Sequence, residues 1–276
     1  MAAVLGTNVA SLWASKNLQT AQSDMADSVE RLSSGLRINR AKDDAAGLGI
    51  ANSLSQQING ANQGIKNLND GISIVQTAEG ALAAASEMAQ RILTLATQGS
   101  NGSMGSTQTA SILSEMSAIL TSINSIQTRT KFSGVTLLNA AAITIQASNV
   151  SGDTITIDLA TSLRKIGTAS GELAFTLAAQ VTGSTFSGIL TQANTYITAL
   201  DTQRATLGAL QNQMEYAVSN VTEMASNLSA ARSRVIDTDY ASETASLTKG
   251  QILQQAATAM LAQANQMPNV ILSLLK

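Results

Sequence analysis

Histidine and cysteine are both absent from this chain of 276 residues. Without histidine, the chain lacks the side chain that most often serves as a general base or a metal ligand, and a Ser/His/Asp triad is impossible. Without cysteine, it cannot form a disulfide bond. We therefore expect neither an enzyme, nor a metal centre, nor a bound cofactor.

Proline, aromatic residues and charged residues are scarce. Pro268 is the single proline, so no earlier residue interrupts a helix by lacking an amide donor. Aromatic residues make up 3% of the chain while hydrophobic residues make up 44%, a composition that favours close contact between helices over a bulky core. Charged residues make up 12% and the net charge is −2, which argues against a nucleic-acid-binding surface.

Features of membrane insertion and of a cleavable leader are also missing. No uncharged apolar stretch reaches about 18 residues, the length of a membrane-spanning helix. The first residues lack the basic start and the apolar run of a secretory signal. We therefore expect no membrane insertion and no signal of this kind.

Apolar residues with steps of three and four occupy both ends of the chain, as in helices that pack through a seam. In the first half they predict helices over 18–36, about 45–98 and about 107–129. The pattern returns from about 188, and a last seam covers 253–271. The expected fold class is mainly α, with long antiparallel helices in coiled-coil packing.

The middle of the chain changes to a period of two. Alternating apolar residues over 143–147 and 155–159 predict a β-hairpin at about 143–159, with its turn at Gly152–Asp153. A weaker alternation over 172–179 suggests a third strand. This small β region separates the two helical halves.

The last seam is unusual because no charged residue lies between Lys249 and Lys276. An apolar face of this length needs a partner. The seam over 18–36 could cover one side, and neighbours in an assembly the rest; an ordinary intramolecular pair is the alternative. The residues expected to form the polymerisation core are Leu18, Met25, Val29, Leu32, Leu253, Ala257, Met260, Ala264, Met267 and Ile271.

Two pairs of acidic residues, Asp43/Asp44 and Asp237/Asp239, are candidates for acid–base chemistry or for binding a cation. Each pair stands where a helix is expected to start, and no third acid clusters nearby. Capping of the free amides in the first helical turn is therefore the favoured interpretation.

Four long motifs resemble one family. Residues 32–52 (LSSGLRINRAKDDAAGLGIAN) and 69–82 (NDGISIVQTAEGAL) are similar to the N-terminal region of bacterial flagellins. Residues 204–220 (RATLGALQNQMEYAVSN) and 233–275 (SRVIDTDYASETASLTKGQILQQAATAMLAQANQMPNVILSLL) are similar to the C-terminal region. The resemblance covers roughly 1–140 and 188–276.

The resemblance implies a division into two domains. An inner coiled-coil core domain would comprise 1–44 and 236–276. A helical rod domain would comprise 45–140 and 141–235. Larger flagellins insert outer domains between the two helical halves, and the short middle of this chain implies that they are absent.

The resemblance also implies a function and partners. The family polymerises into the helical filament that a rotary motor turns for swimming, outside the cell, after export through the flagellar type III channel. Its partners would be further copies of itself, an export chaperone at the C-terminal region, and flagellar cap and hook-junction proteins. The alternative is a hook–filament junction protein or a secreted adhesin-like relative.

Flagellins are also sensed by a vertebrate Toll-like receptor, and residues 90–98 (QRILTLATQ) resemble the recognised motif. Arg91 and Leu95 match it, and Glu115 matches the acidic position on the next helix. Leu93 and Thr94 replace a charged pair, which implies weaker recognition. The other interpretation is that Leu95 packs in the rod while Arg91 and Glu115 form a solvated pair.

Overall fold

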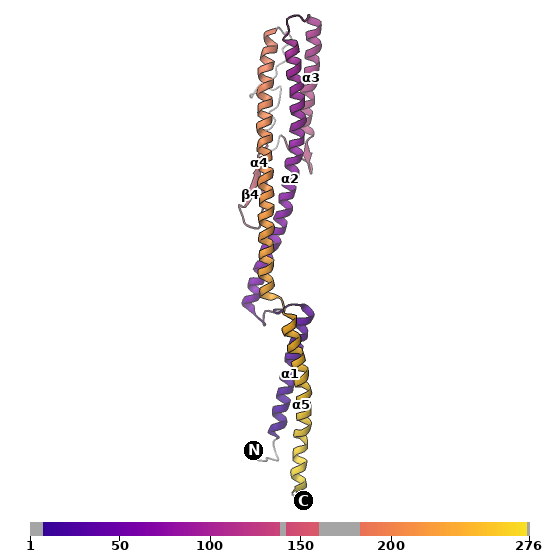
Figure 1. Cartoon of the computed structure of the whole chain (residues 1–276), viewed down its shortest axis with the longest axis vertical. Coiled ribbons are helices and arrows are strands. Elements are labelled where there is room, and N and C mark those ends of the chain that lie inside the picture. The colour runs from indigo at the N-terminus through magenta and orange to yellow at the C-terminus, as the bar shows by residue number, and fades with distance from the viewer. Residues whose placement is uncertain (1–7, 139–141, 160–182, 275–276) are drawn as a thin grey trace. The chain divides into compact units, whose positions relative to one another are not determined.

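The computed structural model describes residues 8–138, 142–159 and 183–274, which form five helices and four short strands (Figure 1). The helices are α1 (Val9–Ser34), α2 (Ala45–Gly99), α3 (Ser106–Arg129), α4 (Gly183–Ile236) and α5 (Tyr240–Leu274). The strands are β1 (Lys131–Phe132), β2 (Val135–Thr136), β3 (Ile143–Gln146) and β4 (Thr154–Ile157). The mainly α fold class is confirmed. The strand suggested over 172–179 lies outside the described residues.

The chain divides into two compact units. Unit 1 consists of Met1–Gln56 and Asn227–Lys276, and unit 2 of Gln57–Ser226. The divisions fall inside α2 and α4, whereas the sequence suggests domain boundaries at the breaks between helices. Each of these two long helices therefore contributes residues to both units.

In unit 1, α1 and α5 lie side by side as an antiparallel pair (Figure 1). At one end the Asn8 side-chain amide donates to the carbonyl oxygen of Ala264 at 2.7 Å. At the other end, 3.8 Å separate Arg31 Nη1 and Glu243 Oε2. The first helix thus begins at Val9 rather than at Leu18, because Asn8 caps it by accepting the Ser11 amide.

The seam between α1 and α5 consists largely of small residues. Its members are half-buried or buried and recur in steps of three and four, as in a coiled coil. They are Ser11, Ala14, Leu18, Ala21, Met25, Ser28 and Leu32 on α1, and Leu247, Gly250, Gln254, Ala257, Leu261 and Ala264 on α5. A Cβ atom placed on Gly250 would lie 3.4 Å from that of Met25, so the backbones approach closely.

The segment between α1 and α2 is tied to the segment between α4 and α5. Gly35 ends α1 with a φ of 72°, where its amide donates to Arg31. The Arg37 amide then donates to Ile236 at 2.7 Å, and Thr238 donates to Gly35 at 3.0 Å. This pairing joins two segments that are far apart in the sequence.

One acid of each predicted pair caps a helix. The Asp44 carboxylate accepts the Gly47 amide at 2.8 Å at the start of α2. The Asp239 carboxylate accepts the Ala241 amide at 2.9 Å at the start of α5. The capping interpretation is confirmed for these two residues.

In unit 2, α2, α3 and α4 lie side by side (Figure 1). Helix α3 runs antiparallel to α2, and Arg91 contacts Glu115 between them. Helix α4 also runs antiparallel to α2, with its Arg204 near Glu79 and its Phe186 against Gly99. The core includes the predicted seam of α4, in which Leu200, Leu207 and Met214 are fully buried.

The predicted β-hairpin is confirmed as β3 and β4, which pair antiparallel from Ile143↔Ile157 to Gln146↔Thr154. It packs on α2, where Gly64 lies directly against the carbonyl group of Ala147. A second hairpin, β1 with β2, was not expected. Its strands have two residues each, too few for an alternation, and its turn places Ser133 and Gly134 at positive φ.

Candidate interaction surface

The structure separates the expected polymerisation residues into two groups. Leu18, Met25 and Leu32 lie half-buried in the seam between α1 and α5, as does Ala257, and Ala264 is 7% exposed. Within a single subunit these five side chains already contact the other helix. Their first role is therefore to hold the helix pair together.

Three of the expected residues lie outside the seam. Val29 is 50% exposed, Leu253 47% and Met260 66%. These large apolar side chains have no cover within the described part of the chain that would remove them from water. Met267 and Ile271 lie in α5, but their side chains are outside the described part.

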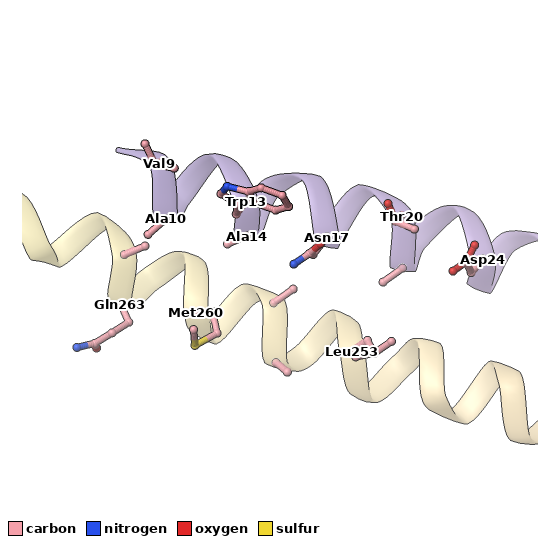
Figure 2. Close-up of a pocket in the computed structure, with 14 residues that line it drawn as sticks. Val9, Ala10, Trp13, Ala14, Asn17, Thr20, Asp24, Leu253, Met260 and Gln263 are labelled. Atoms are coloured by element: carbon pink, nitrogen blue, oxygen red, sulfur yellow. The ribbon is translucent and has the colours of Figure 1, made fainter. Parts of the chain in front are cut away.

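Leu253 and Met260 line a groove of about 750 Å³ between the two helices (Figure 2). Val9 and Trp13 line it from α1, and Trp13 is 62% exposed. Figure 2 shows the Trp13 ring on α1 and Met260 on α5 beside the same space. The seam residues Ala14, Ala21, Ala257 and Ala264 form part of its wall.

Sequence reasoning missed Val9 and Trp13 because it started the first helix at Leu18. The pattern that identifies the true start is Asn8 followed by an apolar helical stretch, since asparagine is a favoured capping residue. Lys16 Nζ lies 5.8 Å from the centre of the Trp13 ring, in a cation–π interaction.

Apolar side chains also lie outside the groove. Leu12 is 68% exposed and Ile252 60%, and neither belongs to the lining of this groove. Each is the sequence neighbour of a groove residue, so its side chain points roughly 100° further around its helix. Unit 1 therefore presents apolar side chains in more than one direction.

Beyond Leu253 the groove continues as a polar channel of about 340 Å³. Its lining includes Asp24 and Asp27 from α1, and Lys249 from α5. The groove is thus apolar toward the N-terminal end of α1 and charged along its C-terminal half. A partner that follows its whole length must match both parts.

The loop after α1 is organised by two carboxylates. The Asn39 amide group donates to Glu30 at 2.8 Å and, with help from Arg40 at 2.7 Å, lowers the pKa of the Glu30 carboxyl. Asp43 accepts the backbone amides of Arg40 at 2.9 Å and Asn39 at 3.2 Å, and these bonds lower the pKa of its carboxyl. Both groups are ionised at neutral pH and fix the loop.

The three residues matched to the receptor motif do not share one environment. Arg91 donates through Nε and Nη2 to the same Glu115 oxygen at 3.0 and 2.7 Å, and the two side chains are 56% and 46% exposed. Leu95 is 2% exposed and packs in the core of unit 2. A partner at the surface could contact the ion pair, whereas Leu95 is covered by the core.

Across the ranges that the structure describes, no three acidic residues gather as a metal site would require. In the same ranges, no helix combines the length and apolarity that a bilayer crossing demands. The exposed apolar side chains and the groove make the surface of unit 1 the most prominent candidate for binding.

The chain matches two described sequence families. Residues 5–142 match the bacterial flagellin N-terminal helical region, and residues 190–275 the bacterial flagellin C-terminal helical region. Flagellin B of Vibrio cholerae is 35% identical over 375 aligned positions that cover 100% of both chains. The flagellin of Halalkalibacterium halodurans is 38% identical over 284 positions, which cover 99% of this chain and 100% of that protein.

One solved structure, that of Bacillus cereus flagellin, is 28% identical, covers 60% of this chain and 94% of its own, and superposes with a TM-score of 0.48. The Vibrio alignment runs over 375 positions against 276 residues here, so this chain is a short form. The two family matches together span most of the chain. The chain therefore belongs to the bacterial flagellins, and it is a structural subunit, not an enzyme, that self-assembles into the extracellular filament of the bacterial flagellum for swimming.

Proposed function

We propose that unit 1 is the inner domain through which flagellin subunits contact one another, and that unit 2 is the rod. The observation that carries this proposal is the exposure of Trp13, Leu253 and Met260 along the groove, at 62%, 47% and 66%. A single subunit leaves these side chains in water. A neighbouring subunit that covers them gains the free energy of removing apolar surface from water.

The small residues of the seam explain why large side chains are left for neighbours. Gly250 of α5 lies against Met25 and Ala21 of α1, so the two helices approach closely. The larger apolar residues outside the seam, among them Trp13, Leu253 and Met260, stand on the flanks of the pair and stay exposed. The helix pair forms within one chain, but its apolar surface is completed only by other chains.

A helical filament needs two different complementary surfaces on each subunit, because head-to-tail contacts do not close on themselves. Unit 1 offers the groove as one surface. It offers Leu12 and Ile252, which point in other directions, as a second. We assign these surfaces to different neighbours in the filament.

A substitution that places a charge in the groove tests whether neighbouring subunits cover it. We expect Met260→Asp to abolish filaments, since burying an unpaired carboxylate at each contact costs several kcal/mol before it is neutralised. The matched control, Met260→Leu, keeps an apolar side chain and should polymerise. Sedimentation and electron microscopy measure filament yield, and circular dichroism checks that both monomers remain helical.

A normal yield of filaments from helical Met260→Asp subunits would refute the assignment of the groove. A loss of filaments from Met260→Leu as well would show that the site requires methionine itself, and would refute a purely apolar contact.

The rod assignment follows from the short middle of the chain. With no large domain between the two helical halves, α2, α3 and α4 of unit 2 would form the filament surface. Limited labelling of intact filaments with a reagent for primary amines tests this: Lys66 and Lys131 in unit 2 should react, and Lys16 in unit 1 should not. Equal reaction of all three in filaments would contradict the arrangement.

We also propose that Arg91 and Glu115 contribute to recognition by a vertebrate Toll-like receptor. The support is their exposure at the surface of unit 2 and the match of residues 90–98 to the family motif. Arg91→Ala should reduce receptor signalling by the monomer, with Arg129→Ala, on α3 and outside the motif, as the control. Equal signalling from both variants and the unaltered protein would assign Arg91 and Glu115 to a solvated pair.

Export would require that the apolar surface of unit 1 is covered before assembly. We propose that a flagellar export chaperone binds the C-terminal region, and that the type III channel delivers the subunit to cap and hook-junction proteins. Deletion of residues 253–276 should abolish co-purification with that chaperone. Retention of the complex would place the chaperone elsewhere on the chain.

The alternative is that the chain is a hook–filament junction protein or an adhesin-like relative. Such a protein would differ from a filament subunit in its abundance at the cell surface. A filament subunit should dominate the protein sheared from the cell surface, whereas a junction protein should be scarce there. Quantitative mass spectrometry of sheared filaments distinguishes the two.

A further inference from the structure

Methionine supplies the only sulfur in this chain, because nine methionines occur and no cysteine. Their exposure differs widely: Met116 and Met214 are 1% and 0% exposed, Met224 is 38% and Met260 66%. Among the methionines with described side chains, Met260 is the most exposed. Oxidation by a dissolved reagent follows exposure, so Met260 should react first.

We propose that Met260 is an oxidation site at which hydrogen peroxide prevents the unassembled subunit from polymerising. This inference rests on the proposed role of the groove. It adds the oxidation of one groove atom, the Met260 sulfur, and specifies that this atom reacts in the unassembled subunit.

The reaction needs no group other than the thioether and the peroxide. The sulfur attacks one peroxide oxygen, an S–O bond forms and the O–O bond breaks. The sulfur loses two electrons and becomes a sulfoxide. The peroxide gains them and, with its protons, leaves as water.

The product is unsuited to the groove. A sulfoxide is polar and accepts hydrogen bonds, whereas a thioether is apolar and flexible. On α5 the groove lining beside Met260 is Leu253, Ala256 and Ala257, which offer no side-chain donor. Gln263 lines the same groove, but Figure 2 shows its amide extending away from the sulfur. The other donors of the lining, Trp13, Asn17 and Thr20, all belong to α1. A neighbour that covers the sulfoxide therefore buries a polar group that the α5 side chains beside it leave unpaired.

Assembly should protect the same atom. In the free subunit the sulfur is open to solvent. In the filament, under the proposed arrangement, a neighbouring chain covers it. Peroxide would therefore remove subunits from the pool that can still assemble, while filaments that already exist remain intact.

The experiment uses the purified full chain and hydrogen peroxide as the probe. Peptide mass spectrometry should detect oxygen addition at Met260 before Met224, and at Met116 and Met214 last. Oxidised subunits should lose polymerisation, with the critical concentration raised roughly tenfold or more, the equivalent of one buried unpaired polar group. Treatment with the two methionine sulfoxide reductases, one for each epimer, should restore assembly.

Two variants isolate the effect. Met260→Leu should polymerise to the same extent before and after the peroxide treatment, because peroxide does not oxidise leucine. Met224→Leu, which removes the next most exposed methionine, should remain as sensitive as the unaltered chain. Circular dichroism checks that the oxidised subunits remain helical.

Preferential oxidation of Met224, or equal loss of assembly by Met260→Leu, would overturn the inference. So would equal oxidation of Met260 in filaments and in free subunits. Failure of this inference is distinct from failure of the proposed function. If oxidised subunits polymerise while untreated Met260→Asp subunits do not, only the oxidation site is wrong; if untreated Met260→Asp subunits polymerise, the groove assignment is wrong.

Discussion

One buried hydroxyl group in unit 2, that of Tyr196, lowers the free energy of unfolding. Tyr196 of α4 is 2% exposed, and within the described residues its hydroxyl has no hydrogen-bond partner. A buried polar group without a partner loses its hydration and gains nothing in return. We expect Tyr196→Phe to raise the free energy of unfolding by about 1 kcal/mol, measured by urea denaturation of the monomer. Tyr216→Phe, at a position that is 78% exposed, is the control and should change little.

The same residue should make the stability depend on alkaline pH. Burial raises the pKa of Tyr196 above its ordinary value of 10.0. In the unfolded chain the phenol ionises near that ordinary value, whereas the folded chain keeps its proton. Above about pH 10 the unfolded state therefore binds fewer protons, and the free energy of unfolding falls as pH rises. Tyr196→Phe should remove this part of the decrease, and an unchanged slope would show that burial does not raise the pKa of Tyr196.

At the scale of elements, the contact between α2 and the hairpin depends on a glycine. Gly64 is buried, and a Cβ atom there would collide with the Ala147 carbonyl, which belongs to the backbone and cannot rotate away. We expect Gly64→Ala to destabilise unit 2 by roughly 1–3 kcal/mol, because β3 and β4 must move off the helix. Thermal unfolding of the monomer measures the change.

Gly80 provides the matched control in the same helix. It is exposed, and a Cβ atom there would meet nothing within 4 Å. Alanine is a better helix former than glycine, so Gly80→Ala should stabilise α2 by up to about 1 kcal/mol. Opposite signs for the two substitutions are the expected result. Stabilisation by both would mean that the hairpin does not rest on Gly64 in solution.

The sequence predicts well the elements in which large apolar residues recur at a regular spacing. The second, third and fourth helices were expected because apolar residues such as Leu200, Leu207 and Met214 recur every seventh position, and the hairpin of β3 and β4 because its apolar residues alternate. The seam of unit 1 was harder to locate. Its most buried positions are alanine, serine and glycine, which apolar counting overlooks, so Val29, Leu253 and Met260 were grouped with the true seam residues although they point elsewhere.

For the whole molecule, the two units differ in how much they bury. Unit 2 encloses large side chains such as Leu68, Leu82 and Phe186 at 1% exposure or less. The seam of unit 1 buries mainly small side chains, which contribute little apolar area. The free energy that holds each region closed should differ accordingly, since local opening follows the number of buried apolar contacts.

Hydrogen exchange can measure this difference and its change on assembly. In the monomer, backbone amides of 247–264 in α5 should exchange faster than those of 200–221 in α4, because fewer large side chains must be exposed to open α5. In the filament, the groove residues Leu253 and Met260 become covered under the proposed arrangement, and anything that binds the closed form slows its opening. The amides of 247–264 should then gain much more protection than those of 200–221, which are already protected in the monomer.

Equal protection of the two segments in the monomer would mean that the small-residue seam is as strong as the core of unit 2. Unchanged exchange of 247–264 in filaments would mean that the surface of unit 1 remains open to water after assembly, and would place the contacts between subunits elsewhere.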